Sequence, residues 1–210
     1  MTIWNKIYKD YKDGGEEYAT LKGGLIPEFL GFIQTNDFKL KKVLDIGCGT
    51  GKYLVFLNEL GFKTDGLDSS PIAVEMTSKS LENSSVVLCK DMYDFELPAN
   101  EYDLIISIAA IHHGLKKQVR RTISQIHQGL IPGGHFFVTL PDNEGKSHWT
   151  TMSEHEEVEP GTRVPLSGPE KGLPHSSFTR DEINDMFSGF SQVNLQLLSD
   201  RGRWIVTGNK

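Results

Sequence analysis

The sequence predicts an α/β protein built on a parallel sheet with helices on both faces. Between residues 41 and 140, short β-branched runs alternate with longer stretches of helical period, which is typical of parallel strands joined by helical crossovers. One of these runs leads directly into a glycine-rich turn. The chain has 210 residues and one domain takes roughly 100 to 200, so a single domain over residues 1–210 is expected.

The expected sheet belongs to a core segment, residues 37–140. Its strands are predicted where β-branched and apolar residues cluster between turn signals, at residues 43–46, 63–68, 85–89, 102–107 and 134–140.

Three crossover helices are expected between these strands. Residues 52–60 place their apolar side chains on one helical face, and Gly61 ends that helix. A second helix over residues 70–83 begins with an N-cap serine followed by proline. A third covers residues 116–130 and ends at a proline-glycine-glycine sequence.

Three segments of the same domain flank this core, at residues 1–36, 141–178 and 179–210. The first contains a predicted helix at residues 24–33. The second is rich in glutamate, glycine and proline, so an irregular insertion on the substrate side is expected. The third begins with a capping box, Thr179 and Glu182, and ends in alternating apolar residues that predict an antiparallel hairpin.

Composition limits the compartment and the partner. The 22 basic and 28 acidic residues give a net charge of −6, which favours a small substrate over nucleic acid. The longest apolar stretch, residues 104–111, is far shorter than the roughly 20 residues that cross a bilayer, so no membrane association is expected. The amino terminus is charged throughout, and Cys48 and Cys89 form no disulfide framework. A cytoplasmic protein is therefore expected.

The chemistry begins at the glycine-rich turn after the first strand. Asp45 precedes Gly47, Gly49 and Gly51, and the next helix starts immediately afterwards. Glycines at alternate positions allow positive φ angles and let a ligand approach the backbone. A purely structural tight turn is the alternative interpretation.

Two further acids follow the second and third strands. Asp68 lies 21 residues after Gly47, where a carboxylate accepts hydrogen bonds from both hydroxyls of a ribose, so an adenosine is implied. Asp91 follows the third strand and can accept from an adenine amino group, with Met92 beside the ring. Helix capping by Asp68 and an ordinary surface role for Asp91 are the alternatives.

These motifs resemble the class I S-adenosylmethionine-dependent methyltransferases, especially the small-molecule type that includes the tellurite-resistance-like enzymes. The resemblance covers about residues 41–140 and includes the segment after the fourth strand, residues 107–113. It implies a Rossmann-like, seven-stranded, mostly parallel sheet with an antiparallel C-terminal hairpin. It also implies S-adenosylmethionine as the cofactor, S-adenosylhomocysteine as the product, and amino-terminal helices that form a lid over the cofactor.

The resemblance assigns the cofactor to a set of residues on the lid, the glycine loop and the ends of the strands. The expected cofactor-binding residues are Tyr11, Asp45, Gly47, Cys48, Gly49, Gly51, Asp68, Ser69, Asp91, Met92, Ser107, Ile108 and His112.

Two other functions share some of these features. A nicotinamide-dependent reductase would need a third glycine where this sequence has Lys52, so pyrophosphate binding is disfavoured. A regulator that binds S-adenosylmethionine without catalysis would keep the same pocket.

Methyl transfer is expected to depend on the position of the acceptor and on one general base. Methyl transfer is an in-line displacement that needs no protein nucleophile, and a base helps when the acceptor loses a proton. His113 follows the fourth strand and is the candidate general base. Capping of the next helix or packing on the cofactor are alternative roles for His113. The candidate acceptor-binding residues are Tyr18, His148, Trp149, Arg163 and His175.

Neither a metal nor nucleic acid is expected as a ligand. His148, His155 and His175 lack the close spacing of metal ligands, so no metal site is predicted. Residues 107–110 do not form the proline-proline-aromatic motif with which enzymes that methylate base amines hold their target. A small metabolite, thiol or oxyanion is the expected acceptor, and the accepting atom and the oligomeric state stay open.

Overall fold

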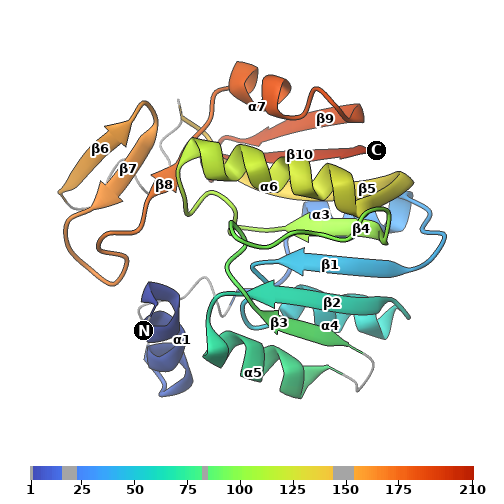
Figure 1. Ribbon diagram of the computed structural model, residues 1–210, viewed down its shortest axis with the longest axis horizontal. Helices are drawn as coiled ribbons and strands as arrows, with labels where there is room; N and C mark the ends of the chain where they lie inside the picture. The colour runs from blue at the N-terminus through green and yellow to red at the C-terminus, as the bar shows by residue number, and fades with distance from the viewer. Residues whose placement is uncertain (1, 16–22, 82–84, 144–153) are drawn as a thin grey trace.

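The computed structural model describes residues 2–15, 23–81, 85–143 and 154–210. Its main sheet has seven strands in the order β3-β2-β1-β4-β5-β10-β9 (Figure 1). These strands are β1 (Lys42–Ile46), β2 (Lys63–Asp68), β3 (Val86–Cys89), β4 (Tyr102–Ser107), β5 (Leu130–Pro141), β9 (Ser191–Leu198) and β10 (Arg203–Asn209). The predicted seven-stranded, mostly parallel sheet is confirmed.

The first five strands are parallel, and their carboxyl ends share one edge of the sheet. β1 pairs with β2 and β4, and the outer pairs β2–β3 and β4–β5 run the same way. β10 is antiparallel to both β5 and β9, which gives the expected closing hairpin. Because β10 runs opposite to β5, its first residue, Arg203, lies opposite Pro141 at the same carboxyl edge.

Helices cover both faces of the sheet, each burying an apolar stripe. On one face, α6 (Lys116–Gly129) and α7 (Arg180–Met186) pack over β5 through residues such as Ile123 and Ile183. On the other face, α3 (Pro27–Thr35) and α4 (Lys52–Glu59) bury Phe29 and Leu54 against β1 and β4. α5 (Pro71–Ser80) packs on β2 and β3, and α1 (Ile3–Lys12) lies beside α5 (Figure 1).

The prediction that residues 141–178 are irregular was wrong for part of this segment. A second, three-stranded sheet forms there from β6 (His155–Glu159), β7 (Thr162–Pro165) and β8 (His175–Ser176), in that order. β6 is mostly exposed on both faces, so its glutamates replace the apolar alternation that normally signals a strand. The strand is therefore defined by pairing with β7 and not by burial.

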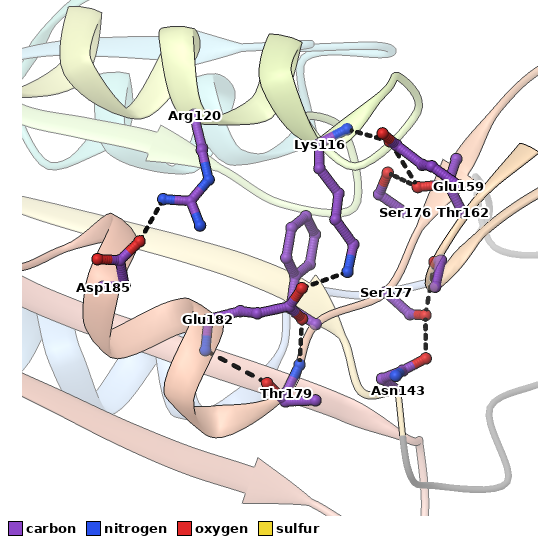
Figure 2. Close-up of polar contacts among 12 residues, drawn as sticks. Lys116, Arg120, Asn143, Glu159, Thr162, Ser176, Ser177, Thr179, Glu182 and Asp185 are labelled. Atoms are coloured by element: carbon purple, nitrogen blue, oxygen red, sulfur yellow. Dashed lines mark hydrogen bonds and ion pairs between the residues drawn. The ribbon is translucent and has the colours of Figure 1, made fainter.

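A set of polar contacts fixes this second sheet to the core (Figure 2). The Lys116 amide donates to Oε1 of Glu159 at 2.7 Å, while the Lys116 ammonium pairs with Glu182 at the start of α7. Ser176 donates from Oγ to the Gly114 carbonyl at 2.7 Å and from its amide to the His112 carbonyl at 2.8 Å. The second sheet is thus held directly against the loop that follows β4.

Among the described residues, none of the helices combines the length and apolar character needed to span a bilayer.

Candidate cofactor and acceptor site

A cavity of about 740 Å³ lies at the carboxyl edge of the main sheet, beside α1 and the second sheet. This volume falls within the roughly 300–1,000 Å³ typical of small-molecule sites. The wall contains twelve of the residues singled out in the sequence, namely Asp45, Gly47, Cys48, Gly49, Asp68, Ser69, Met92, Ile108, His112, His113, Arg163 and His175. The predicted cofactor and acceptor residues therefore share one cavity.

Four other predicted residues lie off this wall. Ser107 is buried and donates to the Ile46 carbonyl at 2.8 Å, so it joins β4 to β1. Gly51 caps α4, Tyr11 is partly exposed on α1, and Asp91 is exposed and accepts from the Tyr93 amide at 2.9 Å. The remaining candidates, Tyr18, His148 and Trp149, fall outside the described residues.

The glycine loop is fitted tightly between its neighbours. Gly47 has a φ of +78°, and a β-carbon placed there would lie 2.3 Å from Cβ of Ala110. The amides of Gly47 and Cys48 both donate to the Leu67 carbonyl, at 2.7 and 3.0 Å. A side chain at position 47 would therefore disturb both the turn and the loop after β4.

Asp68 holds the loop in place and also faces the cavity. Its Oδ2 accepts from the Gly49 amide at 3.0 Å, and its Oδ1 accepts from the Ser70 amide at 2.8 Å. Burial raises the pKa of this carboxyl group, and the amide hydrogen bonds oppose that rise. A carboxylate has about four acceptor positions, so both oxygens can also accept from a ligand hydroxyl.

Asp45 is a buried carboxyl group at the end of β1, with only 3% of its surface exposed. Burial, followed by the nearby Asp68, raises its pKa to about 8, while the charge of Lys52 lowers it. A cationic ligand group beside Asp45 would favour the ionised form. The site is therefore suited to an ammonium group.

α1 covers the cofactor end of the cavity. Asn5 Oδ1 accepts from the Ser70 hydroxyl at 3.1 Å, and Lys12 forms an ion pair with Glu75 on α5 at 3.1 Å. Trp4 and Tyr8 line the cavity from this helix. A β-carbon at Gly49 would lie 2.5 Å from the Tyr8 hydroxyl, which shows how closely α1 approaches the loop.

Three buried histidines meet at the acceptor end. His112, His113 and His175 have candidate ligand atoms that all lie within 4.8 Å of one another. Burial lowers the pKa of all three, for His175 to about 4, so they are neutral at pH 7. Neutral imidazoles can accept a proton or ligate a divalent cation such as Zn²⁺. Glu170 lies 3.3 Å from Nε2 of His175.

Arg203 supplies a positive charge to the same end of the cavity. It is partly buried, and its Nη1 donates to Oγ1 of Thr139 at 3.4 Å. Burial lowers the pKa of its guanidinium group. After burial and neighbouring histidines, the charge of Arg203 contributes to the lowered pKa values of His112 and His113.

The sequence interpretation missed several wall residues, among them Trp4, Tyr8, Lys52, Tyr53 and Arg203. The predicted hairpin contained a signal for one of these residues, Arg203. A final hairpin strand that returns antiparallel to β5 must begin at the carboxyl edge, so its first residue, Arg203, is placed at the site by topology alone.

Comparisons with known proteins point to one family. The family described as a methyltransferase domain matches residues 18–199. A probable tRNA methyltransferase 9B of Bos taurus is 31% identical over 186 residues, covering 80% of this chain and 39% of that protein. A phosphoethanolamine N-methyltransferase of Plasmodium falciparum is 30% identical over 140 residues, covering 64% of this chain and 52% of that protein. The chain thus spans about half or less of the length of these relatives.

A crystal structure of a Pyrococcus horikoshii protein has the same fold, with a TM-score of 0.74 and 17% identity over 100% of this chain and 99% of that one. The family match covers most of the chain and includes the glycine loop, Asp68 and the histidine pair. The chain therefore belongs to the class I S-adenosylmethionine-dependent methyltransferases.

Proposed function

We propose that this protein transfers a methyl group from S-adenosylmethionine to a small-molecule acceptor. One observation carries the proposal: the glycine loop with Asp45 and Asp68 opens into the same cavity as the histidine cluster. When bound, S-adenosylmethionine supplies a methyl group on a positively charged sulfur. The protein has to hold the acceptor in line with that methyl group and keep water away.

The cofactor half is assigned residue by residue. Asp68 accepts from the ribose hydroxyls, and Asp45 faces the ammonium group of the methionine part. Met92 provides an apolar wall for the adenine, and Lys90 also lines the cavity. Asp91 was expected to contact the adenine. Because Asp91 is exposed, this contact is tested by a substitution of its own.

His113 is the proposed general base. Its Nδ1 lies 2.9 Å from the Ala110 carbonyl oxygen, which can only accept, so Nδ1 carries the hydrogen. Nε2 is left with a lone pair that can take the proton released by the acceptor. The rings of His113 and Trp4 pack edge to face, with centroids 4.7 Å apart, which restricts the orientation of the imidazole.

A base role is favoured over a metal site for the three histidines. Arg203 places a positive charge near His112 and His113, and this charge repels a divalent cation more strongly than the single charge of a proton. Turnover after removal of divalent cations tests for a metal-dependent reaction.

A small acceptor fits the enclosure of the site. Arg163, Glu170 and His175 close one side of the cavity from the second sheet and the segment leading into it. The net charge of −6 gives no long-range attraction to nucleic acid. The names of the relatives include both a tRNA methyltransferase and a phosphoethanolamine methyltransferase, so tRNA is the second candidate acceptor.

A cytoplasmic location is proposed with this function. Cys48 is buried and Cys89 is exposed, and both are free thiols. Free thiols are typical of a reducing compartment.

An acceptor screen tests the activity. The protein is incubated with S-adenosylmethionine and either a metabolite panel or total tRNA, and released S-adenosylhomocysteine is measured. Turnover on a metabolite with none on tRNA supports the proposal, whereas turnover only on tRNA reassigns the acceptor. Tight cofactor binding without turnover on either would favour a regulator, and binding of NAD instead of S-adenosylmethionine would favour a reductase.

A further inference from the structure

We infer that the acceptor carries an oxyanion group, a carboxylate or a phosphate, which binds Arg203 in the cavity that Arg163 also lines. This inference rests on the proposed function, because it describes the acceptor of that same reaction. Both arginines line the cavity, Arg203 from the start of β10 and Arg163 from β7.

Arg203 has the surroundings of a ligand-binding cation. Within the part of the chain that the structure describes, it is absent from every ion pair, and its one side-chain hydrogen bond goes to the neutral hydroxyl of Thr139. Its guanidinium has five N–H donors, so most of them are available to a ligand. A buried guanidinium binds a carboxylate or phosphate well because two parallel hydrogen bonds match its fork.

The charges around Arg203 leave its positive field in place. Burial raises the pKa of Tyr53 to about 12, so the neighbouring phenol is neutral at pH 7, as are His112 and His113. Arg201 adds further positive charge near Arg203. Of the acidic groups at this end, Glu170 lies beside His175, and Asp142 accepts from the indole N–H of Trp204 at 3.0 Å.

The order of the strands places Arg203 at the acceptor end. Asp68 ends β2, and the sheet continues through β1, β4 and β5 to β10. Four steps of roughly 4.8 Å separate β2 from β10 by about 19 Å. The glycine loop and its cofactor half lie between these two strands, and the histidines follow β4. An anion on Arg203 would thus lie beyond the cofactor, on the side of His113.

The alternative is that Arg203 binds the carboxylate of the cofactor itself. Three substitutions and two nucleoside ligands distinguish the two roles. Arg203→Met removes the charge, and Arg203→Lys keeps it without the fork. Arg201→Met is the matched control, because Arg201 is exposed in the turn before β10 and pairs with Asp200. S-Adenosylhomocysteine has an amino-acid part with a carboxylate and an ammonium group, and 5′-methylthioadenosine is a thioether of the same nucleoside that lacks this whole part.

The measurement is calorimetry of both nucleosides, followed by titration of inorganic phosphate and of acetate into protein saturated with S-adenosylhomocysteine. We expect unchanged binding of both nucleosides in all variants. Wild type and Arg201→Met should bind one of the two anions, and Arg203→Met should bind it at least about tenfold more weakly. Arg203→Lys should fall between them. The anion that binds distinguishes a phosphate acceptor from a carboxylate acceptor.

Other outcomes overturn the inference. Loss of S-adenosylhomocysteine binding in Arg203→Met, with 5′-methylthioadenosine unaffected, would assign Arg203 to the cofactor. Equal anion binding in wild type and Arg203→Met, or no anion binding by the saturated wild type, would also contradict the subsite. Failure of wild type to bind S-adenosylhomocysteine at all would instead overturn the proposed function.

Discussion

The imidazole of His113 is fixed by one backbone contact: its Nδ1 lies 2.9 Å from the carbonyl oxygen of Ala110. Ala110 is also the residue whose side chain approaches Gly47 of the cofactor loop. The loop after β4 therefore contacts the cofactor turn with one residue and orients the proposed base with the same residue. A shift of either part would move the other, which couples cofactor binding to the position of the base.

His113→Ala should lower turnover by about 10²- to 10⁴-fold, the usual contribution of a positioned base. Its affinity for S-adenosylhomocysteine should stay within about twofold, because the proposed role concerns the acceptor alone. Burial holds the pKa of His113 well below 6.5, so the wild-type rate should stay flat above that pH and fall only in more acidic solution. Steady-state kinetics across pH check this.

The control for His113 is His127→Ala, which removes a histidine of α6 that packs on Phe190 away from the cavity. It should leave turnover unchanged. An equal loss in both variants, or full activity of His113→Ala, would remove the case for a base at this position.

Asp45 should make folding stability depend on pH. Its pKa is about 8 in the folded protein and about 3.8 ordinarily, so between these values the folded state holds a proton that the unfolded state releases. The contribution of this proton to the free energy of unfolding is fully present below about pH 4. It decreases as the pH rises toward 8, by up to about 1.4 kcal/mol per pH unit.

Asp45→Asn removes this titration. Urea unfolding of wild type and Asp45→Asn at several pH values should therefore show a difference that shifts in favour of the variant as the pH rises. A constant difference between pH 5 and pH 8 would show that Asp45 is ionised throughout this range.

Glu159→Ala should loosen the second sheet without unfolding the core. Oε1 of Glu159 accepts from the Lys116 amide at 2.7 Å and from the Thr162 hydroxyl at 2.9 Å in a partly buried setting, so we expect a loss of about 1–2 kcal/mol in stability. Because this sheet lines only the acceptor side, KM for the acceptor should rise while cofactor affinity is retained. Arg120→Met is the comparison, since its pair with Asp185 is exposed and is worth at most about 0.5 kcal/mol. A similar effect of the two substitutions on acceptor KM would argue against this positioning role.

Removal of divalent cations should leave the rate unchanged. The proposed reaction uses neutral imidazoles as they stand, beside the positive charge of Arg203. The test is turnover after treatment with EDTA, with elemental analysis of the purified protein. Lost activity that one equivalent of a divalent cation restores would reassign His112, His113 and His175 as metal ligands.

The core could be predicted because its sequence signals are strong and local. β2 and β4 were predicted at their observed bounds, and β1 within one residue. β1 and β4 are buried and mostly apolar, as is typical of parallel strands. The start of β5 was placed four residues late, because Pro132 and Gly133 within it are typical of turns. β6 was missed because His155–Glu159 pairs through its backbone while its charged side chains face water.

The site residues also divide into those that local sequence reveals and those that depend on long-range folding. The glycine loop, Asp45 and Asp68 follow a fixed spacing along one stretch of chain and were found from it. Arg203 reaches the cavity only through the pairing of β10 with β5, so spacing along the chain does not reveal it. His112, His113 and His175 were each named from the sequence, but their meeting depends on the contact of Ser176 with the loop after β4.

The most direct test is calorimetric titration of S-adenosylhomocysteine into wild type, Asp68→Ala, Asp68→Asn and Asp91→Ala. Wild type should bind, and both Asp68 variants should lose about 1.5–3 kcal/mol of binding free energy, the loss typical of hydrogen bonds to a charged group. Asp91→Ala should lose less, because its carboxylate lies off the cavity wall. Full affinity in both Asp68 variants, or no binding by folded wild type, would contradict the assignment of this cavity to the cofactor.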